Sequence, residues 1–108
     1  MLRLITKHRE YGEFRLPQQS IRSAHFYAAV IPAEAEFALG ITISKRIGKA
    51  HTRNLLKRRI KAWTRLNRAD LPAGRKVNLV AKPGAGELTW QELCLELDTL
   101  KAKLTAAG

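Results

Sequence analysis

Four basic residues recur at intervals of four positions in the middle of the chain: Arg53, Lys57, Lys61 and Arg65. In a helix this spacing places them in one row along one face. A row of cations matches the phosphates that a folded or duplex nucleic acid presents, and each neutralised phosphate releases counterions. Asn54 falls on the same arc and could read a base edge or a sugar hydroxyl. The spacing therefore predicts a surface that binds nucleic acid.

The charge of the whole chain is concentrated around this row. The 108 residues include 20 Lys and Arg against 9 Asp and Glu, a formal net charge of +11. No acid lies between Phe37 and Ala69, and ten of the bases lie in that interval: Lys45, Arg46, Lys49, Arg53, Lys57, Arg58, Arg59, Lys61, Arg65 and Arg68. The remaining bases and acids nearly cancel. We therefore expect a nearly neutral domain with one strongly cationic segment and a polyanionic partner.

The element that must position these bases is a helix over residues 50–67. Its apolar residues fall on the opposite arc: Leu55, Leu56, Ile60, Ala62, Trp63 and Leu66. Arg59 falls inside that apolar arc, so we expect its side chain to snorkel or to lie at an edge of the arc. A solvated helix face usually mixes the signs of its charges, whereas this face carries only positive ones, which favours binding. Binding to a membrane surface would require a free apolar face, which a domain this small needs for its core.

The turn that precedes this helix, residues 44–49, carries Lys45, Arg46 and Lys49. It lacks the spacing of a Walker motif, so we do not expect it to bind a nucleoside triphosphate. Instead, its bases extend the predicted phosphate track to the helix N-terminus, whose dipole favours anions.

The other elements are shorter. We predict a helix from Thr6 to about Phe14, strands over 23–31, 36–44 and 75–81, and a last helix that begins at a Thr89–Glu92 capping box. The order α-β-β-α-β-α predicts an α+β fold, a small α-β sandwich with one mixed sheet of three or four strands, in a single nucleic-acid-binding domain over 1–108. The short connection between the first two strands predicts an antiparallel hairpin.

Several side chains are assigned to the core or to solvent rather than to a site. We expect Trp63 and Trp90 in the core, and Glu92, Glu96 and Asp98 in solvent. Tyr11, Phe14, Phe26 and Tyr27 could stack unpaired bases at about 1–3 kcal/mol each. Burial in the core is the commoner fate of such aromatic residues.

Catalytic constellations are missing from the sequence. His8, His25 and His51 have no partner at a metal-ligand spacing, and no carboxylates cluster as a two-metal nuclease requires. We therefore predict no catalytic residue and no metal ligand, and a chain that cuts nothing alone. Cys94 is the only cysteine, which excludes a disulfide framework and suits a reducing compartment. With no secretory signal and no apolar stretch of about 18 residues, the expected location is the cytoplasm, with no membrane partner.

The run LGITISKRIGKAHTRNLLKR over 39–58 resembles the signature of the bacterial ribonuclease P protein family. The opening residues 4–11 resemble the first helix of that family, and residues 77–83 resemble its late strand. The resemblance implies an accessory subunit of an endoribonuclease, a hydrolase in which the RNA subunit performs the Mg²⁺-dependent removal of the 5′ leader from precursor tRNA. It also implies one protein per ribonuclease P RNA, contact with precursor tRNA and a left-handed βαβ crossover.

The resemblance implies a role for each residue that matches a position of the family's motif. The polar positions of the motif are matched by Lys45, Arg46, Lys49, Arg53, Asn54, Lys57, Arg58 and Lys61, and we add Arg65 from the charge row. Tyr11 and Phe14 match two aromatic residues of the first helix that line a cleft for the leader. They are three positions apart, where the family has four.

Three further positions depart from the family. Leu55 stands where it usually has an arginine, Ala62 where an acid or amide is common, and Ala29 where a further aromatic residue is common. Tyr27, on the same strand face as Ala29, is expected to compensate in the cleft. The alternative is a ribosomal or other structured-RNA-binding protein without a role in cleavage. A helix-turn-helix DNA-binding protein is disfavoured because the basic helix lies between strands.

Overall fold

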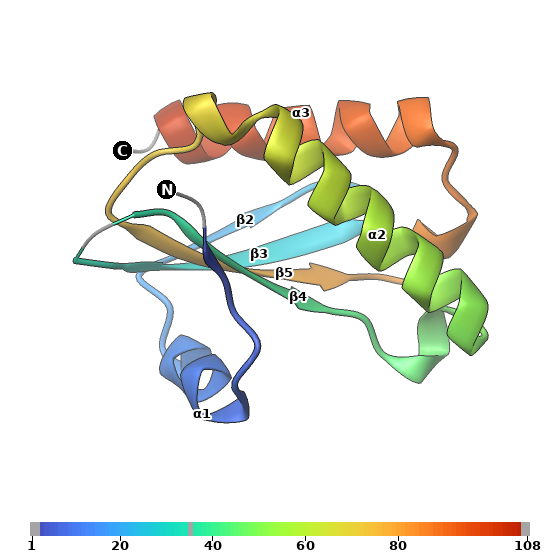
Figure 1. Ribbon diagram of the computed structural model, residues 1–108, viewed down its shortest axis with the longest axis horizontal. Helices are drawn as coiled ribbons and strands as arrows, with labels where there is room; N and C mark the ends of the chain where they lie inside the picture. The colour runs from blue at the N-terminus through green and yellow to red at the C-terminus, as the bar shows by residue number, and fades with distance from the viewer. Residues whose placement is uncertain (1–2, 35, 107–108) are drawn as a thin grey trace.

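The computed structural model describes residues 3–34 and 36–106, which form one mixed sheet with helices on both faces (Figure 1). The strands are β1 (Arg3–Leu4), β2 (Gln19–Arg22), β3 (Phe26–Pro32), β4 (Ala38–Thr42) and β5 (Arg75–Ala81), and the helices are α1 (His8–Tyr11), α2 (Ala50–Leu66) and α3 (Trp90–Ala106). The sheet order is β1-β4-β5-β3-β2. The predicted α+β fold with one mixed sheet is confirmed, although the sheet has five strands rather than three or four.

Two cores lie on opposite faces of the sheet. In Figure 1, α2 and α3 lie on one face and α1 on the other. The larger core joins the sheet to the two long helices, with Phe26, Ile60 and Leu93 fully buried. The smaller core lies under α1 and includes Ile5 and Ile31. Because side chains alternate along a strand, β3 contributes to both cores.

The predicted hairpin between β3 and β4 is wrong, because β5 lies between them. β5 pairs antiparallel with β3, from Phe26↔Ala81 to Pro32↔Arg75, and parallel with β4. The connection over 33–37 has to cross two strand spacings, about 10 Å, which a short loop can span. Its Ala33 N–H donates to the Gly74 carbonyl at 2.9 Å, just before β5 begins. A short loop therefore permitted a hairpin without requiring one.

The two edge strands were not predicted, and the first helix is shorter than expected. β1 has only two residues, and Ile21 is the only buried residue of β2, so neither shows an alternating pattern. The helix expected from Thr6 to Phe14 is instead the four-residue α1 followed by a 3₁₀ helix over Gly12–Arg15. Both stop before Pro17, which restricts the backbone of the preceding residue.

The long elements follow the prediction. α2 and β5 occupy the expected ranges, and α3 begins at the predicted capping box: the Glu92 N–H donates to Thr89 Oγ1 at 3.1 Å and the Thr89 N–H donates to Glu92 Oε1 at 2.9 Å. β4, α2 and β5 form a parallel βαβ unit; its left-handedness stays a prediction. Trp63 is buried as expected, but Trp90 is 37% exposed, so its assignment to the core is wrong.

Glu96 is also not solvated as predicted. It accepts hydrogen bonds from Ser23 Oγ at 2.6 Å and from the His25 N–H at 2.8 Å, and its carboxylate contacts His25 Nδ1. Burial raises the pKa of Glu96, but these hydrogen bonds outweigh it and hold the pKa below its usual value. The carboxylate therefore ties α3 to the segment between β2 and β3.

Candidate nucleic-acid interface

The cationic face of α2 is positioned by the apolar face behind it. Leu56, Ile60 and Trp63 are buried against the sheet and α3. The opposite side of the helix points outward, so Lys57, Arg58 and Arg65 are exposed, while Arg53 and Lys61 are half-buried. The ion pairs among residues 3–34 and 36–106 all lie elsewhere, so no carboxylate neutralises this face.

Arg59 and Leu55 lie at the border of that face. The Arg59 guanidinium donates to the Leu88 carbonyl at 3.2 Å, so the side chain reaches past the apolar arc to a backbone acceptor, as predicted. Leu55 was expected on the apolar arc but is 37% exposed. The position at which the family usually has an arginine is thus an exposed leucine here.

The turn before α2 is held by a glycine. Lys45–Ile47 form a 3₁₀ helix, and Gly48 follows with φ 155° and ψ −171°, a region that only glycine adopts readily. Arg53 Nε then donates to the Gly48 carbonyl at 3.1 Å, which ties the helix back to the turn. Lys45, Arg46 and Lys49 are all exposed in this arrangement. Among the described residues no side chain caps the N-terminus of α2, and uncapped helix amides favour an anion.

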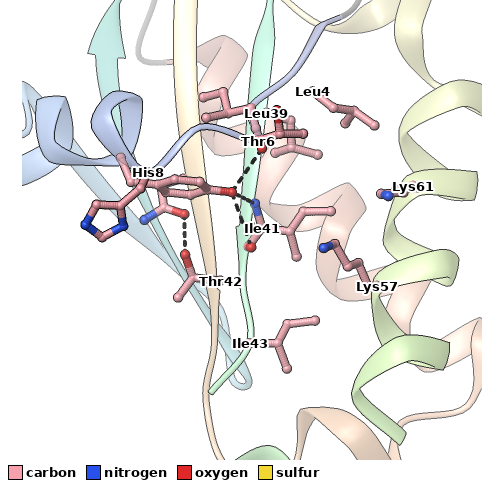
Figure 2. Close-up of a pocket in the computed structure, with 12 residues that line it drawn as sticks. Leu4, Thr6, His8, Leu39, Ile41, Thr42, Ile43, Lys57 and Lys61 are labelled. Atoms are coloured by element: carbon pink, nitrogen blue, oxygen red, sulfur yellow. Dashed lines mark hydrogen bonds between the residues drawn. The ribbon is translucent and has the colours of Figure 1, made fainter. Parts of the chain in front are cut away.

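Two hollows flank α2. The outer one, about 490 Å³, is lined by His51, Asn54, Lys57, Arg58 and Lys61. We call the other the β4 groove; it has a volume of about 590 Å³ and lies between α2 and the chain around α1 (Figure 2). Its lining is Leu4, Ile5, Thr6, His8, Tyr11, Leu39, Ile41, Thr42, Ile43, Lys57, Lys61 and Asn78. Lys57 and Lys61 belong to both hollows, so the helix face that carries them is continuous with the groove wall.

The β4 groove exists because β1 is short. β1 pairs with β4 only at Arg3↔Ala38 and Leu4↔Leu39, and the Ile5 N–H then donates to the Leu39 carbonyl at 2.7 Å before the chain turns away. The edge of β4 beyond that point is open to the groove, where Ile41 and Ile43 lie on the same side as Lys57 (Figure 2).

Tyr11 takes the place of a partner strand at that edge. Its hydroxyl accepts the Ile41 N–H at 3.1 Å and donates to the Ile5 carbonyl at 3.1 Å, with the Ile41 carbonyl 3.4 Å away. The ring lies against Gly40, where a Cβ would stand 2.7 Å from Tyr11 Cε1. A residue without a side chain at position 40 therefore lets Tyr11 lie on the sheet.

An ion-pair network holds α1 on the sheet beside Tyr11. Arg3 donates to both Glu10 carboxylate oxygens, and Lys76 Nζ lies 2.9 Å from Glu10 Oε2 and 2.8 Å from Glu13 Oε1. The hydrogen bonds from Arg3, followed by that from Lys76, lower the pKa of Glu10 to about 2. The network joins β1, α1 and β5, and so fixes the helix that carries Tyr11.

The three predicted cleft aromatics share one cluster but not one groove. Tyr11, Phe14 and Tyr27 all pack in or against the smaller core. Of the three, only Tyr11 lines the groove, whereas Phe14 is buried in the smaller core and 7% exposed. Tyr27 is half-buried, with the Arg22 guanidinium 5.6 Å from its ring centre and Ser20 Oγ 3.3 Å from its hydroxyl. Phe14 and Tyr27 therefore support this face of the sheet rather than line the groove.

The groove also contains polar residues that were not predicted. Thr42 and Asn78 belong to strands adjacent in space, and Thr42 Oγ1 donates to Asn78 Oδ1 at 2.8 Å. The sequence held one signal: Asn78 is a polar residue between the apolar residues of a predicted strand. Its neighbourhood with Thr42 depends on the register of β4 and β5, which the sequence does not show.

Residues 3–34 and 36–106 contain no group of three His, Cys, Asp or Glu side chains that could hold a metal ion. A helix that crosses a membrane would have to be longer and more apolar than any in these residues.

Comparisons with known proteins agree on one family. The model of the Ribonuclease P family matches residues 2–105. The ribonuclease P protein component of Geotalea uraniireducens is 32% identical over 101 residues, which cover 93% of this chain and 88% of that protein. That of Desulforapulum autotrophicum is 36% identical over 84 residues, covering 77% and 72%.

Solved structures show the same fold. The ribonuclease P protein of Staphylococcus aureus superimposes with a TM-score of 0.84 at 24% identity, covering 94% of this chain and 95% of that one. The protein from Thermotoga maritima gives 0.83 at 20% identity, covering 92% and 94%. The chain belongs to the bacterial ribonuclease P protein family: it is the protein subunit of a ribonucleoprotein endonuclease that matures the 5′ end of tRNA.

Proposed function

We propose that the cationic face of α2 binds ribonuclease P RNA while the β4 groove holds the 5′ leader of precursor tRNA. The observation that carries this proposal is the shared position of Lys57 and Lys61, which line both the outer hollow and the groove. A protein arranged in this way can contact two RNA segments from one helix. It would then hold the leader beside the catalytic RNA.

The chemistry of the two surfaces differs in a way that suits their RNA segments. The face with Lys45, Arg46, Lys49, Arg53, Asn54, Lys57, Arg58, Lys61 and Arg65 offers cations and one amide, which suits the closely spaced phosphates of a folded RNA. The groove combines the cations of one wall with Ile41, Ile43 and the Tyr11 ring. Apolar and aromatic groups beside cations suit unpaired bases on a phosphate backbone. Tyr11 is the predicted cleft aromatic that this role retains, with Phe14 and Tyr27 behind it.

We assign the magnesium ions of the reaction to the RNA subunit. The described residues do not group three metal-ligating side chains, and the lining of the groove includes no carboxylate. The protein would promote cleavage by holding the leader and by screening the repulsion between RNA phosphates, a task that otherwise requires more Mg²⁺. We further propose one protein per RNA, and a cytoplasmic complex, in keeping with a lone cysteine.

The proposal is tested by the affinity of the assembled holoenzyme for precursor and mature tRNA. Lys61→Ala removes a cation from the groove wall, so we expect it to weaken precursor binding more than mature tRNA binding when protein saturates the RNA. Lys103→Ala, on α3, removes a lysine outside both hollows and serves as the control. Equal effects of Lys61→Ala on the two RNAs would show that the groove does not hold the leader.

A further inference from the structure

We propose that Asn78, oriented by Thr42, forms hydrogen bonds with one unpaired base in the β4 groove and gives the enzyme a base preference at one leader position. This inference rests on the proposed function of the groove and adds a specificity-determining residue to it. Three observations support it: the position of Asn78 in the sheet, its hydrogen bond from Thr42, and the hydrogen bonds that occupy the Tyr11 hydroxyl.

The neighbours of the half-buried Asn78 in the sheet have small side chains. In the sheet register Asn78 lies opposite Gly40 of β4 and opposite Ala29 of β3, so the three residues form one row on the face that carries α1. Glycine and alanine have the smallest side chains, so no long side chain extends from either register partner beside the amide. Asn78 lines the groove, and the row leads from it directly to the Tyr11 ring over Gly40.

Within the described residues, only the oxygen of the Asn78 amide has a hydrogen-bond partner. Thr42 Oγ1 donates to its Oδ1 at 2.8 Å, which fixes the orientation of the amide plane. The Nδ2 group has no partner among residues 3–34 and 36–106, and neither of its N–H groups is sealed from solvent. An asparagine in the middle of a strand is unfavourable compared with a β-branched residue, and this one keeps an amide donor available to a ligand. An RNA base in the groove would supply an acceptor for it.

The chemistry of the ligand follows from what the amide offers. Nδ2 is a donor and Oδ1 keeps a second lone pair as an acceptor, side by side in one plane. This pair matches a base edge that carries an acceptor beside a donor, and such two-point contacts discriminate between bases. A backbone phosphate has no donor, so it would not use both halves of the amide.

Tyr11 cannot discriminate between bases by hydrogen bonding. Its hydroxyl is occupied by Ile41 and Ile5 backbone groups, so only its ring is free to contact a base. Ring stacking tolerates every base because each has a π-face. Tyr11 therefore provides a stacking surface that tolerates every base, and Asn78 discriminates between bases.

The test uses the holoenzyme assembled from the full chain and ribonuclease P RNA. Precursor tRNAs that carry each of the four bases at each leader position are compared by kcat/KM and by Kd. We expect the unchanged protein to prefer some bases at one position by about 5- to 100-fold, the range of one good two-point contact. Asn78→Val, which suits a strand, should reduce that preference to about twofold or less. Asn78→Asp, which keeps the shape but loses the donor, should change which base is preferred.

The matched control is Gln91→Ala, which removes an exposed amide of α3 outside the groove and should keep the preference. The inference is overturned if Asn78→Val keeps the full preference, or if the unchanged protein shows no preference at any position while a precursor still binds more tightly than mature tRNA. That second result would leave the groove as the leader site. If precursor and mature tRNA bind equally well to the unchanged holoenzyme, the proposed function of the groove fails and this inference fails with it.

Discussion

Replacing Gly40 with alanine tests how the groove is built. The added Cβ would lie 2.7 Å from Tyr11 Cε1 and 3.1 Å from both Cζ and the hydroxyl oxygen. Ordinary carbon contacts are about 3.5–4.0 Å, so the ring must move by about 1 Å. Overpacking of this kind costs about 1–3 kcal/mol, and each hydrogen bond lost from the displaced hydroxyl costs about 0.5–1.5 kcal/mol more. We therefore expect Gly40→Ala to lower the free energy of unfolding by about 2–4 kcal/mol.

Urea denaturation measures this loss, and two comparisons make it specific. Gly12→Ala is the matched control, because nothing lies within 4 Å of a Cβ at that position and its φ of −64° suits alanine. We expect it to change stability by less than about 1 kcal/mol. In a Tyr11→Ala background the clash is gone, so Gly40→Ala should then cost less than about 1 kcal/mol. Equal costs of Gly40→Ala with and without the Tyr11 ring would show that contact with this ring does not cause the loss of stability.

Three further substitutions test the cationic face of α2, the turn at Gly48 and the ion pairs of Glu10. Lys57→Ala should lower the slope of log K against log salt for RNA binding by about one, whereas Lys103→Ala should not; an unchanged slope for Lys57→Ala would mean that this face does not meet phosphate. Gly48→Ala should cost about 1–3 kcal/mol in thermal unfolding because of its positive φ, and a neutral result would contradict the assigned turn. The pKa of Glu10 is lowered from 4.5 to about 2, so its contribution to stability is present above pH 4.5 and is lost as the pH falls toward 2. Glu10→Gln should therefore flatten acid unfolding in that window, and an identical acid-unfolding curve would disprove the role of the Arg3 contact.

The elements predicted from the sequence are those whose signal extends over many residues. α2 shows a repeated apolar arc and an opposing basic arc over 17 residues, and α3 has a capping box as well as regular leucines. β1 and β2 are too short for any period to appear. The order of strands depends on which long-range pairing buries β5 best, and a short loop between β3 and β4 does not reveal that choice.

The candidate site divides in the same way. The cationic residues were predictable because they lie close together in the sequence, in one helix and the turn before it, and share one sign. The groove was not, because β4, β5, α1 and α2 each contribute part of its lining from distant parts of the chain. Phe14 shows that residue type alone does not reveal burial: an aromatic ring suits base stacking, but this one is buried in the smaller core.

Reconstitution shows whether the protein holds the leader beside the catalytic RNA. Ribonuclease P RNA is incubated with precursor tRNA over a range of Mg²⁺ concentrations, with and without the protein, and removal of the 5′ leader is followed. We expect the protein to lower the Mg²⁺ concentration required for cleavage and to raise the affinity for precursor over mature tRNA, while the protein alone cleaves nothing. Unchanged leader removal and unchanged precursor affinity at every Mg²⁺ concentration would contradict a protein that holds the leader beside the catalytic RNA.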